Sequence, residues 1–206
     1  MKKTLLIALI FTIMAGFSAT AQTKFVIKTS MGDIHGILYD ETPGHRDNFI
    51  KLANEGWYDG SRFHRVIRDF MIQGGGNKDG QLDPGYSLPA EIVPDKFHKR
   101  GALAAARMGD EVNPERKSSG CQFYIVQGRK FGDEELNAIE QRFNMKMSTK
   151  QRQAYKSSGG APHLDGTYTI FGEIISGMDV VDRIASVEVF QNAPIDPVTF
   201  SVEIIE

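Results

Sequence analysis

Short runs of alternating apolar and polar residues recur along this 206-residue chain, and they constrain its fold more than any other feature. The first run, residues 25–39, alternates on both sides of a Met-Gly-Asp turn and predicts a β-hairpin. Further strands are predicted over residues 101–108, 122–127 and 168–175, and the C-terminal residues 198–206 alternate in the same way. Many short strands of this kind predict a mainly β domain whose sheet closes into a barrel.

Two other segments have the signals of helices that would flank this barrel. Thr42 is a good N-cap and precedes a proline, and Phe49, Leu52 and Ala53 then form an apolar stripe at helical spacing. A shorter helix is predicted over residues 178–185. We therefore expect a barrel capped by two helices.

Residues 131–158 differ from the rest of the chain, because they are polar and have the period of a helix. Leu136, Ile139 and Phe143 recur at helical spacing, and a Ser-x-x-Gln capping box that starts at Ser148 predicts a second short helix. The segment is therefore predicted to be a helical insertion into the β domain. It is either structural decoration or a lip that contacts substrate proteins, and the sequence leaves both interpretations open.

The N-terminal residues 1–21 have the composition of a targeting segment rather than of a folded element. Lys2 and Lys3 form a basic start, residues 4–17 are apolar, and a small-residue Ala-Thr-Ala site ends at Ala21. This order is typical of a secretory signal peptide, and the apolar run is shorter than the about 20 residues that span a bilayer. We expect an exported protein, in the periplasm rather than fully secreted, with no stable membrane anchor after cleavage.

The remaining residues 22–206 are predicted to form one domain, and their composition excludes several classes of function. The chain has 24 basic and 26 acidic residues, and loss of Lys2 and Lys3 changes the net charge from −2 to −4. Such a charge gives no electrostatic footprint for nucleic acid. Cys121 is the only cysteine, so no internal disulfide can form. We expect a monomer.

The most informative stretch is RFHRVIRDFMIQGGG, residues 62–76, in which arginines are interleaved with large apolar side chains. Residues 63–67 are predicted to form one strand and residues 70–74 its antiparallel return, which places Arg65 almost opposite Gln73. Arginine does not deprotonate and so cannot act as a base. Its planar fork can nevertheless donate several hydrogen bonds in a fixed direction.

One reaction needs only such a donor beside an apolar pocket, and it is rotation about an X-Pro peptide bond. The barrier of about 18–20 kcal/mol arises from amide resonance. A donor aimed at the twisted amide, where the nitrogen regains its lone pair, stabilises the transition state more than the planar ground state. No nucleophile, metal or cofactor is required.

Three motifs in this chain resemble those of the cyclophilin family. FHRVIRDFMIQGG (residues 63–75) is similar to the family signature, SGCQFYI (119–125) to its G-S-Q-F-F-I strand, and residues 163–184 to its W-L-D-G-x-H-x-x-F-G-x-V block. The motifs occur in the family's order, and the resemblance covers most of residues 25–206 apart from the insertion. It implies a peptidyl-prolyl cis–trans isomerase on a closed eight-stranded antiparallel barrel capped by two helices.

The resemblance also implies the roles of individual residues. Arg65 would be the catalytic arginine and Gln73 the neighbour that orients it. The substrate-binding positions would be Phe70, Met71, Ala106, Arg107, Gln122, Phe123, His163, Leu164 and Tyr168. Tyr168 stands where the family often has histidine, and His163 where eukaryotic members typically have tryptophan, which predicts weak binding of cyclosporin. The implied substrates are proline-containing peptides and unfolded exported proteins, with no cofactor and no metal.

Other interpretations stay open from the sequence alone. Phe70, Met71 and Phe123 could be ordinary core residues, and Arg65 could be a surface ion-pair partner. The same barrel could serve as a non-catalytic peptide-binding chaperone, although the retained arginine and pocket aromatics favour the enzyme. Cys121 could be the nucleophile of a thiol-dependent hydrolase, but no triad pattern surrounds it.

Overall fold

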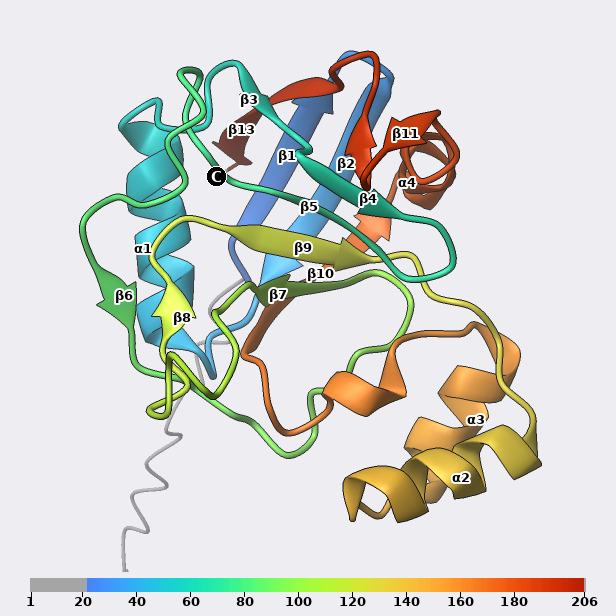
Figure 1. The fold of residues 1–206 in the computed structure, drawn as a ribbon. Helices are drawn as coiled ribbons and strands as arrows, with labels where there is room; N and C mark the ends of the chain where they lie inside the picture. The colour runs from blue at the N-terminus through green and yellow to red at the C-terminus, as the bar shows by residue number, and fades with distance from the viewer. Residues whose placement is uncertain (1–21, 206) are drawn as a thin grey trace, which may run out of the picture.

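The computed structural model describes residues 22–205, in which one curled β-sheet is surrounded by four α-helices (Figure 1). The strands are β1 (Lys24–Thr29), β2 (Gly32–Leu38), β3 (Ser61–Arg62), β4 (Arg65–Ile67), β5 (Met71–Gly74), β6 (Ser87–Leu88), β7 (Ala102–Ala105), β8 (Ser118–Ser119), β9 (Phe123–Val126), β10 (Ile170–Ser176), β11 (Val189–Phe190), β12 (Ala193–Pro194) and β13 (Thr199–Ile205). The helices are α1 (Pro43–Asn54), α2 (Asp133–Phe143), α3 (Thr149–Ser157), α4 (Met178–Ile184) and the short 3-10 helix η1 (Pro162–Leu164). The predicted signal peptide, residues 1–21, lies outside the described residues.

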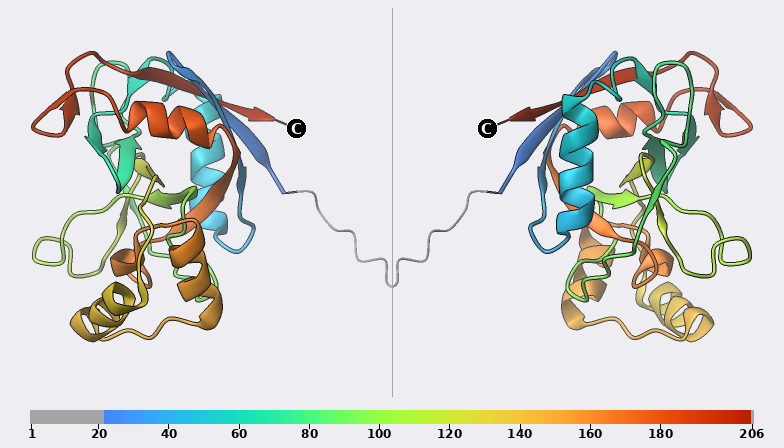
Figure 2. Two further views of the ribbon diagram at one scale, coloured as in Figure 1. Left: turned by 90° about the vertical axis from the view of Figure 1, so that its right-hand side faces the viewer. Right: turned by 90° about the vertical axis from the view of Figure 1, so that its left-hand side faces the viewer.

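The main sheet has nine strands in the order β3-β13-β1-β2-β10-β7-β9-β5-β4, and its pairings are antiparallel. β6 pairs with β8 and β11 pairs with β12 in two further ladders. The main sheet curls strongly, as the two side views of Figure 2 show, so that one of its faces encloses a core. No helix within residues 22–205 is long and apolar enough to cross a membrane.

The predicted closed barrel of eight strands is not confirmed, because the described part of the chain has nine strands in the sheet and the edge strands β3 and β4 do not pair with each other. These two strands are consecutive in the chain and are separated only by Phe63 and His64. β3 pairs with β13, whereas β4 pairs with β5. A short break in one extended segment thus leaves the sheet as an open half-barrel.

The elements predicted from local pattern are confirmed. β1 and β2 form the N-terminal hairpin, and α1 and α4 are the two flanking helices, at opposite sides of the curled sheet (Figure 1). α1 buries Phe49 and Leu52, and α4 buries Val181 and Ile184, in the cluster that also contains Phe25 of β1. Each helix is therefore held on the domain by its apolar stripe, as its sequence pattern requires.

The two helices predicted within residues 131–158 are present as α2 and α3, which lie together below the sheet in the view of Figure 1. The Ser148 Oγ atom accepts a hydrogen bond from the Gln151 backbone N–H at 3.2 Å, and Gln151 Oε1 accepts one from the Ser148 N–H at 2.7 Å, which is the predicted capping box. Leu136 and Tyr155 are fully buried in a small cluster that includes Phe97 of the β domain. The insertion is therefore packed firmly on the domain.

Candidate active site

Arg65 and Gln73 are opposite each other in the β4–β5 hairpin, as the sequence predicted. The Arg65 Nη1 atom donates a hydrogen bond to Gln73 Oε1 at 3.1 Å. Gln73 Nε2 donates in turn to Gln122 Oε1 at 3.2 Å, and Gln122 Nε2 donates to the Leu82 carbonyl oxygen at 2.9 Å. Because this series of bonds holds one side of the guanidinium while Arg65 stays exposed, its other N–H groups can reach a ligand.

A cavity of about 150 Å³ opens beside Arg65. This volume is several times the roughly 30 Å³ that a water molecule occupies in the liquid, so a five-membered ring fits in it. The lining residues are Arg65, Phe70, Met71, Gln73, Ala106, Arg107, Tyr124, Leu164 and Tyr168. The predicted site residues are thus brought together here, with the exceptions of Gln122, Phe123 and His163.

A second and larger hollow, of about 560 Å³, continues the surface on the other side of Gln73. It shares Gln73, Ala106 and Arg107 with the first cavity, and Gln122 lines it. Gln122 therefore lines the second hollow, where its side chain is bonded to Gln73. Together the two hollows form one groove, and they adjoin along Gln73, Ala106 and Arg107.

Phe70 and Met71 line the same cavity even though they are neighbours in the chain. Strict alternation would place adjacent strand residues on opposite faces. The ladder, however, starts at Met71, and Phe70 belongs to the preceding turn, in which Asp69 has a φ of +63° and the Phe70 N–H donates to the Ile67 carbonyl at 3.1 Å. The turn rotates Phe70 toward the cavity, and the sequence left this point undecided.

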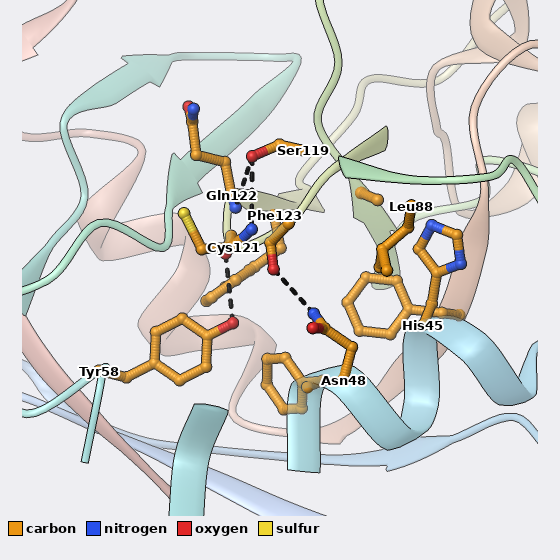
Figure 3. Close-up of a pocket in the computed structure, with 12 residues that line it drawn as sticks. His45, Asn48, Tyr58, Leu88, Ser119, Cys121, Gln122 and Phe123 are labelled. Atoms are coloured by element: carbon orange, nitrogen blue, oxygen red, sulfur yellow. Dashed lines mark hydrogen bonds between the residues drawn. The ribbon is translucent and has the colours of Figure 1, made fainter. Parts of the chain in front are cut away.

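The prediction that Phe123 lines the pocket is wrong, and Tyr124 takes that place. Phe123 is only 1% exposed and packs in the core near the Tyr58 ring, with 5.7 Å between the ring centroids (Figure 3). Tyr124 is the ladder partner of Gln73. Residues directly opposite each other in a ladder project from the same face, so Tyr124 shares the face of Gln73 and Phe123 faces away from it.

Arg107 and Tyr168 form one wall of the cavity and support each other. The Arg107 guanidinium carbon lies 4.5 Å from the centroid of the Tyr168 ring, within cation–π distance. Arg107 Nε donates to the Thr167 carbonyl at 3.0 Å, and Nη1 donates to an Asp110 carboxylate oxygen at 2.7 Å. Since these partners use its donors, the Arg107 side chain is a fixed part of the wall.

His163 stands beside the cavity rather than in it. Its ring centroid is 5.3 Å from that of Phe70, which lines the cavity. The neighbouring Leu164 does reach the lining. Burial lowers the pKa of His163 below its ordinary value of 6.5, with a further contribution from nearby His98. The imidazole is therefore neutral at neutral pH.

The family model described as "Cyclophilin type peptidyl-prolyl cis-trans isomerase/CLD" matches residues 24–204. The chain belongs to this family. It is 35% identical over 193 residues to a "Putative peptidyl-prolyl cis-trans isomerase" of Staphylococcus saprophyticus subsp. saprophyticus, which covers 90% of this chain and 93% of the relative. It is 38% identical over 174 residues to a "Putative bifunctional phosphatase/peptidyl-prolyl cis-trans isomerase" of Streptococcus pyogenes serotype M6, but that match covers 80% of this chain and only 34% of the Streptococcus protein.

Solved cyclophilins have the same fold as this chain. A Cryptosporidium parvum cyclophilin-type isomerase superposes with a TM-score of 0.68 at 24% identity, covering 90% of this chain and 99% of the solved one. The same parasite protein, crystallised in the presence of the dipeptide ala-pro, gives a TM-score of 0.67. The protein described here is thus a cyclophilin-type peptidyl-prolyl cis–trans isomerase by sequence, with the matching architecture.

Behind the pocket of this cyclophilin lies a buried hydrogen-bond network that the sequence did not reveal. The Asp165 carboxylate accepts from the His98 N–H at 2.8 Å, lies 2.9 Å from His98 Nδ1, and accepts from the Tyr155 hydroxyl at 2.6 Å. A carboxylate only accepts, so in the neutral imidazole Nδ1 carries the proton. His98 Nε2 then accepts from the Tyr124 hydroxyl at 2.9 Å. The network joins the pocket wall to helix α3 of the insertion.

The structure gives no support to Cys121 as a nucleophile in this cyclophilin. Cys121 is buried; its thiol donates to the Leu82 carbonyl at 3.2 Å, and its carbonyl accepts from the Tyr58 hydroxyl at 3.2 Å (Figure 3). Burial raises the pKa of Cys121 to about 11, so the thiol is protonated at neutral pH. Within residues 22–205, no group of three or more His, Cys, Asp or Glu side chains is arranged to hold a metal ion.

Proposed function

We propose that this cyclophilin accelerates X-Pro rotation with Arg65 as the catalytic residue and Gln73 as the residue that positions it. The observation that carries the proposal is the Arg65 guanidinium, held by Gln73 at 3.1 Å, at the edge of a cavity of about 150 Å³ that Phe70, Met71 and Leu164 also line. A proline ring in the cavity places its amide nitrogen beside the donors of Arg65. The nitrogen becomes a hydrogen-bond acceptor only as the amide twists, so the bond strengthens in the transition state.

The other wall residues hold the substrate. Phe70, Met71, Leu164 and Tyr168 supply apolar contact for the proline ring, and Tyr124 completes the wall where Phe123 was expected. Ring burial between aromatic and aliphatic side chains fixes the position of the prolyl amide.

The peptide backbone binds along the strand end that follows β7. The Ala106 N–H donates to the Gln122 carbonyl, and the Ala106 carbonyl accepts from the Ser119 N–H, so Ala106 is already paired inside the domain. Among the described residues, no such bond occupies the backbone groups of Arg107. We therefore assign the backbone contact to Arg107, while the Gln122 side chain borders the groove beside it.

The cellular role that we propose is assistance in the folding of exported proteins, in the periplasm, by a monomeric enzyme. The support is the signal-peptide pattern of residues 1–21, which lie outside the described residues. N-terminal sequencing of the protein recovered from the periplasmic fraction tests it. A chain that begins at Gln22 supports the proposal, and an uncleaved chain in the cytosol contradicts it.

We also infer that residues 61–67 act as one strand that closes the sheet into the eight-stranded barrel typical of the family. The support is the short break between β3 and β4, across which the Phe63 N–H donates to the Val198 carbonyl at 3.1 Å and the Val66 N–H to the Asn192 carbonyl at 2.7 Å. Amide hydrogen exchange tests the idea, because a continuous strand protects both N–H groups to a similar degree.

The catalytic role is tested by Arg65→Ala, assayed by exchange NMR on an X-Pro peptide. We expect kcat/KM to fall by about tenfold to a hundredfold, because a hydrogen bond from a charged donor contributes roughly 1.5–3 kcal/mol. Arg65→Lys should also be impaired, since a point charge does not replace the planar fork. Wild-type turnover by Arg65→Ala, with the fold intact, would contradict the proposed mechanism, and an inactive wild-type protein that still binds the peptide would favour the non-catalytic chaperone.

A further inference from the structure

A row of aromatic rings continues from the cavity onto the insertion. The ring centroid of Phe70 is 5.3 Å from that of His163, and the His163 centroid is 6.1 Å from that of Phe143. Phe143 is the last residue of α2, and it is 45% exposed. The insertion therefore adds a large, accessible aromatic side chain to a surface that starts at the proline pocket.

The packing of the insertion does not explain why Phe143 is aromatic. Leu136 and Tyr155 already anchor the two helices, and both are fully buried. The chain turns away directly after Phe143, because Asn144 adopts the left-handed conformation with a φ of +48° and ends the helix. Phe143 thus remains at the rim, outside the small core of the insertion.

The position of Phe143 is nevertheless fixed relative to the pocket. α2 packs against η1, which contains His163 and Leu164. The residue that follows η1 is Asp165, which accepts the hydrogen bond from Tyr155 of α3 at 2.6 Å. Because contacts on both sides hold this rim in place before a ligand arrives, binding to it costs little conformational entropy.

The distances between the ring centroids show how far this surface extends from the proline cavity. Steps of 5.3 and 6.1 Å place Phe143 no more than about 11 Å from Phe70. An extended peptide advances by roughly 3.3–3.6 Å per residue, so this distance corresponds to about three residues. A side chain two or three positions from the bound proline therefore reaches the space between His163 and Phe143.

We propose that Phe143 and His163 form an additional subsite for a bulky aliphatic or aromatic side chain located two or three residues from the proline of an extended polypeptide substrate. The subsite is continuous with the proline cavity through Phe70, and this assignment rests on the proposed function of that cavity. Phe143 is a specificity-determining residue in this scheme. It takes no part in the rotation itself, which requires only the groups around Arg65.

The test compares peptides of alanine around one central proline with peptides that carry a single phenylalanine two or three residues before or after it. Exchange NMR gives kcat/KM for the wild-type protein, for Phe143→Ala, and for Phe190→Ala. Phe190 is a matched control, because it is 69% exposed and lines none of the cavities described above. The four phenylalanine positions show on which side of proline the subsite lies.

We expect the wild-type protein and Phe190→Ala to prefer one phenylalanine peptide over the alanine peptide by about threefold to tenfold, as burial of part of an aromatic ring implies. Phe143→Ala should lose this preference and keep its rate on the alanine peptide, and Phe143→Leu should recover part of the preference. An unchanged preference in Phe143→Ala overturns the subsite.

The proposed function and the subsite fail in distinguishable ways. If the wild-type protein does not turn over the alanine peptide, the proposed function fails. Calorimetry of the phenylalanine peptides then still measures the contribution of Phe143 to binding. If turnover is normal but no phenylalanine position is preferred, only the subsite is refuted.

Discussion

Asp165→Ala should destabilise the protein strongly, because this carboxylate is the common acceptor of a buried network. The side chain is 5% exposed, and it accepts from the His98 N–H at 2.8 Å and from the Tyr155 hydroxyl at 2.6 Å, while His98 Nδ1 lies 2.9 Å away. Burial, together with the nearby Asp165 charge, raises the pKa of Tyr155 far above its usual value, so the hydroxyl remains a donor. Alanine leaves these three donors, and the more distant Gln151 Nε2 at 3.5 Å, without this acceptor.

The size of the effect follows from the number of donors that lose their partner. Each buried donor left unsatisfied costs roughly 1–3 kcal/mol, and breaking a buried pair on one side typically costs about 3–5 kcal/mol in total. We expect the free energy of unfolding to fall by about 4 kcal/mol, out of the roughly 5–15 kcal/mol of an ordinary domain. With a urea slope of about 2 kcal/mol per molar, the midpoint should move down by about 2 M.

Urea denaturation followed by the fluorescence of Trp57, the only tryptophan, measures this change. Asp179→Ala is the control, because Asp179 pairs with Arg183 on the surface and its side chain is 74% exposed. The control should unfold close to wild type. Should Asp165→Ala fail to fold, Asp165→Asn and Tyr155→Phe still test the network, since each removes only part of it. A midpoint for Asp165→Ala equal to that of Asp179→Ala would refute the reasoning.

Three further outcomes are expected. Cys121→Ser should keep its kcat/KM on an X-Pro peptide, because the thiol with a pKa of about 11 is not a nucleophile at neutral pH, and an inactive variant would revive the hydrolase interpretation. Burial, and secondarily the Arg65 charge, lowers the pKa of His64 below 6.5. Because the unfolded state then binds that proton more tightly than the folded state, the midpoint of urea unfolding should be constant above about pH 6.5 and should fall as the pH drops below it. The value of kcat/KM should be flat above that pH. His163→Trp should tighten cyclosporin binding by about tenfold to a hundredfold, because tryptophan adds a larger apolar face and an indole N–H donor, and kcat/KM should change little. Equal affinities of the two proteins, measured by calorimetry, would show that His163 does not contact that ligand.

The local sequence pattern was sufficient to predict an element wherever the residues that stabilise it lie close together in the chain. The hairpin of β1 and β2, the helix α1 and the capping box at Ser148 follow from alternation, helical spacing and hydrogen bonds between near neighbours. The Arg65–Gln73 pair belongs to the same class, because a hairpin with a short turn determines which residues are opposite each other. The catalytic candidates could therefore be named from the sequence.

The pocket wall was a different case, because it depends on how strands distant in the chain are paired. Alternation shows that Phe123 and Tyr124 face opposite sides, but only the pairing of β5 with β9 shows that Tyr124 shares the face of Gln73. The side on which Phe70 lies was set by the conformation of a turn, which includes Asp69 at a positive φ. The conformation of this turn depends on how the whole hairpin packs.

The sequence by itself determined the family, the longer strands, the two flanking helices, the two helices between β9 and β10 and the Arg65–Gln73 pair. Only the tertiary structure brought His98 to Asp165, across 67 residues, and placed Phe143 beside His163 at the rim of the groove. The reason is physical. Periodicity and capping are recorded in neighbouring residues, whereas a buried network and a composite surface exist only after distant segments have packed against each other and excluded water.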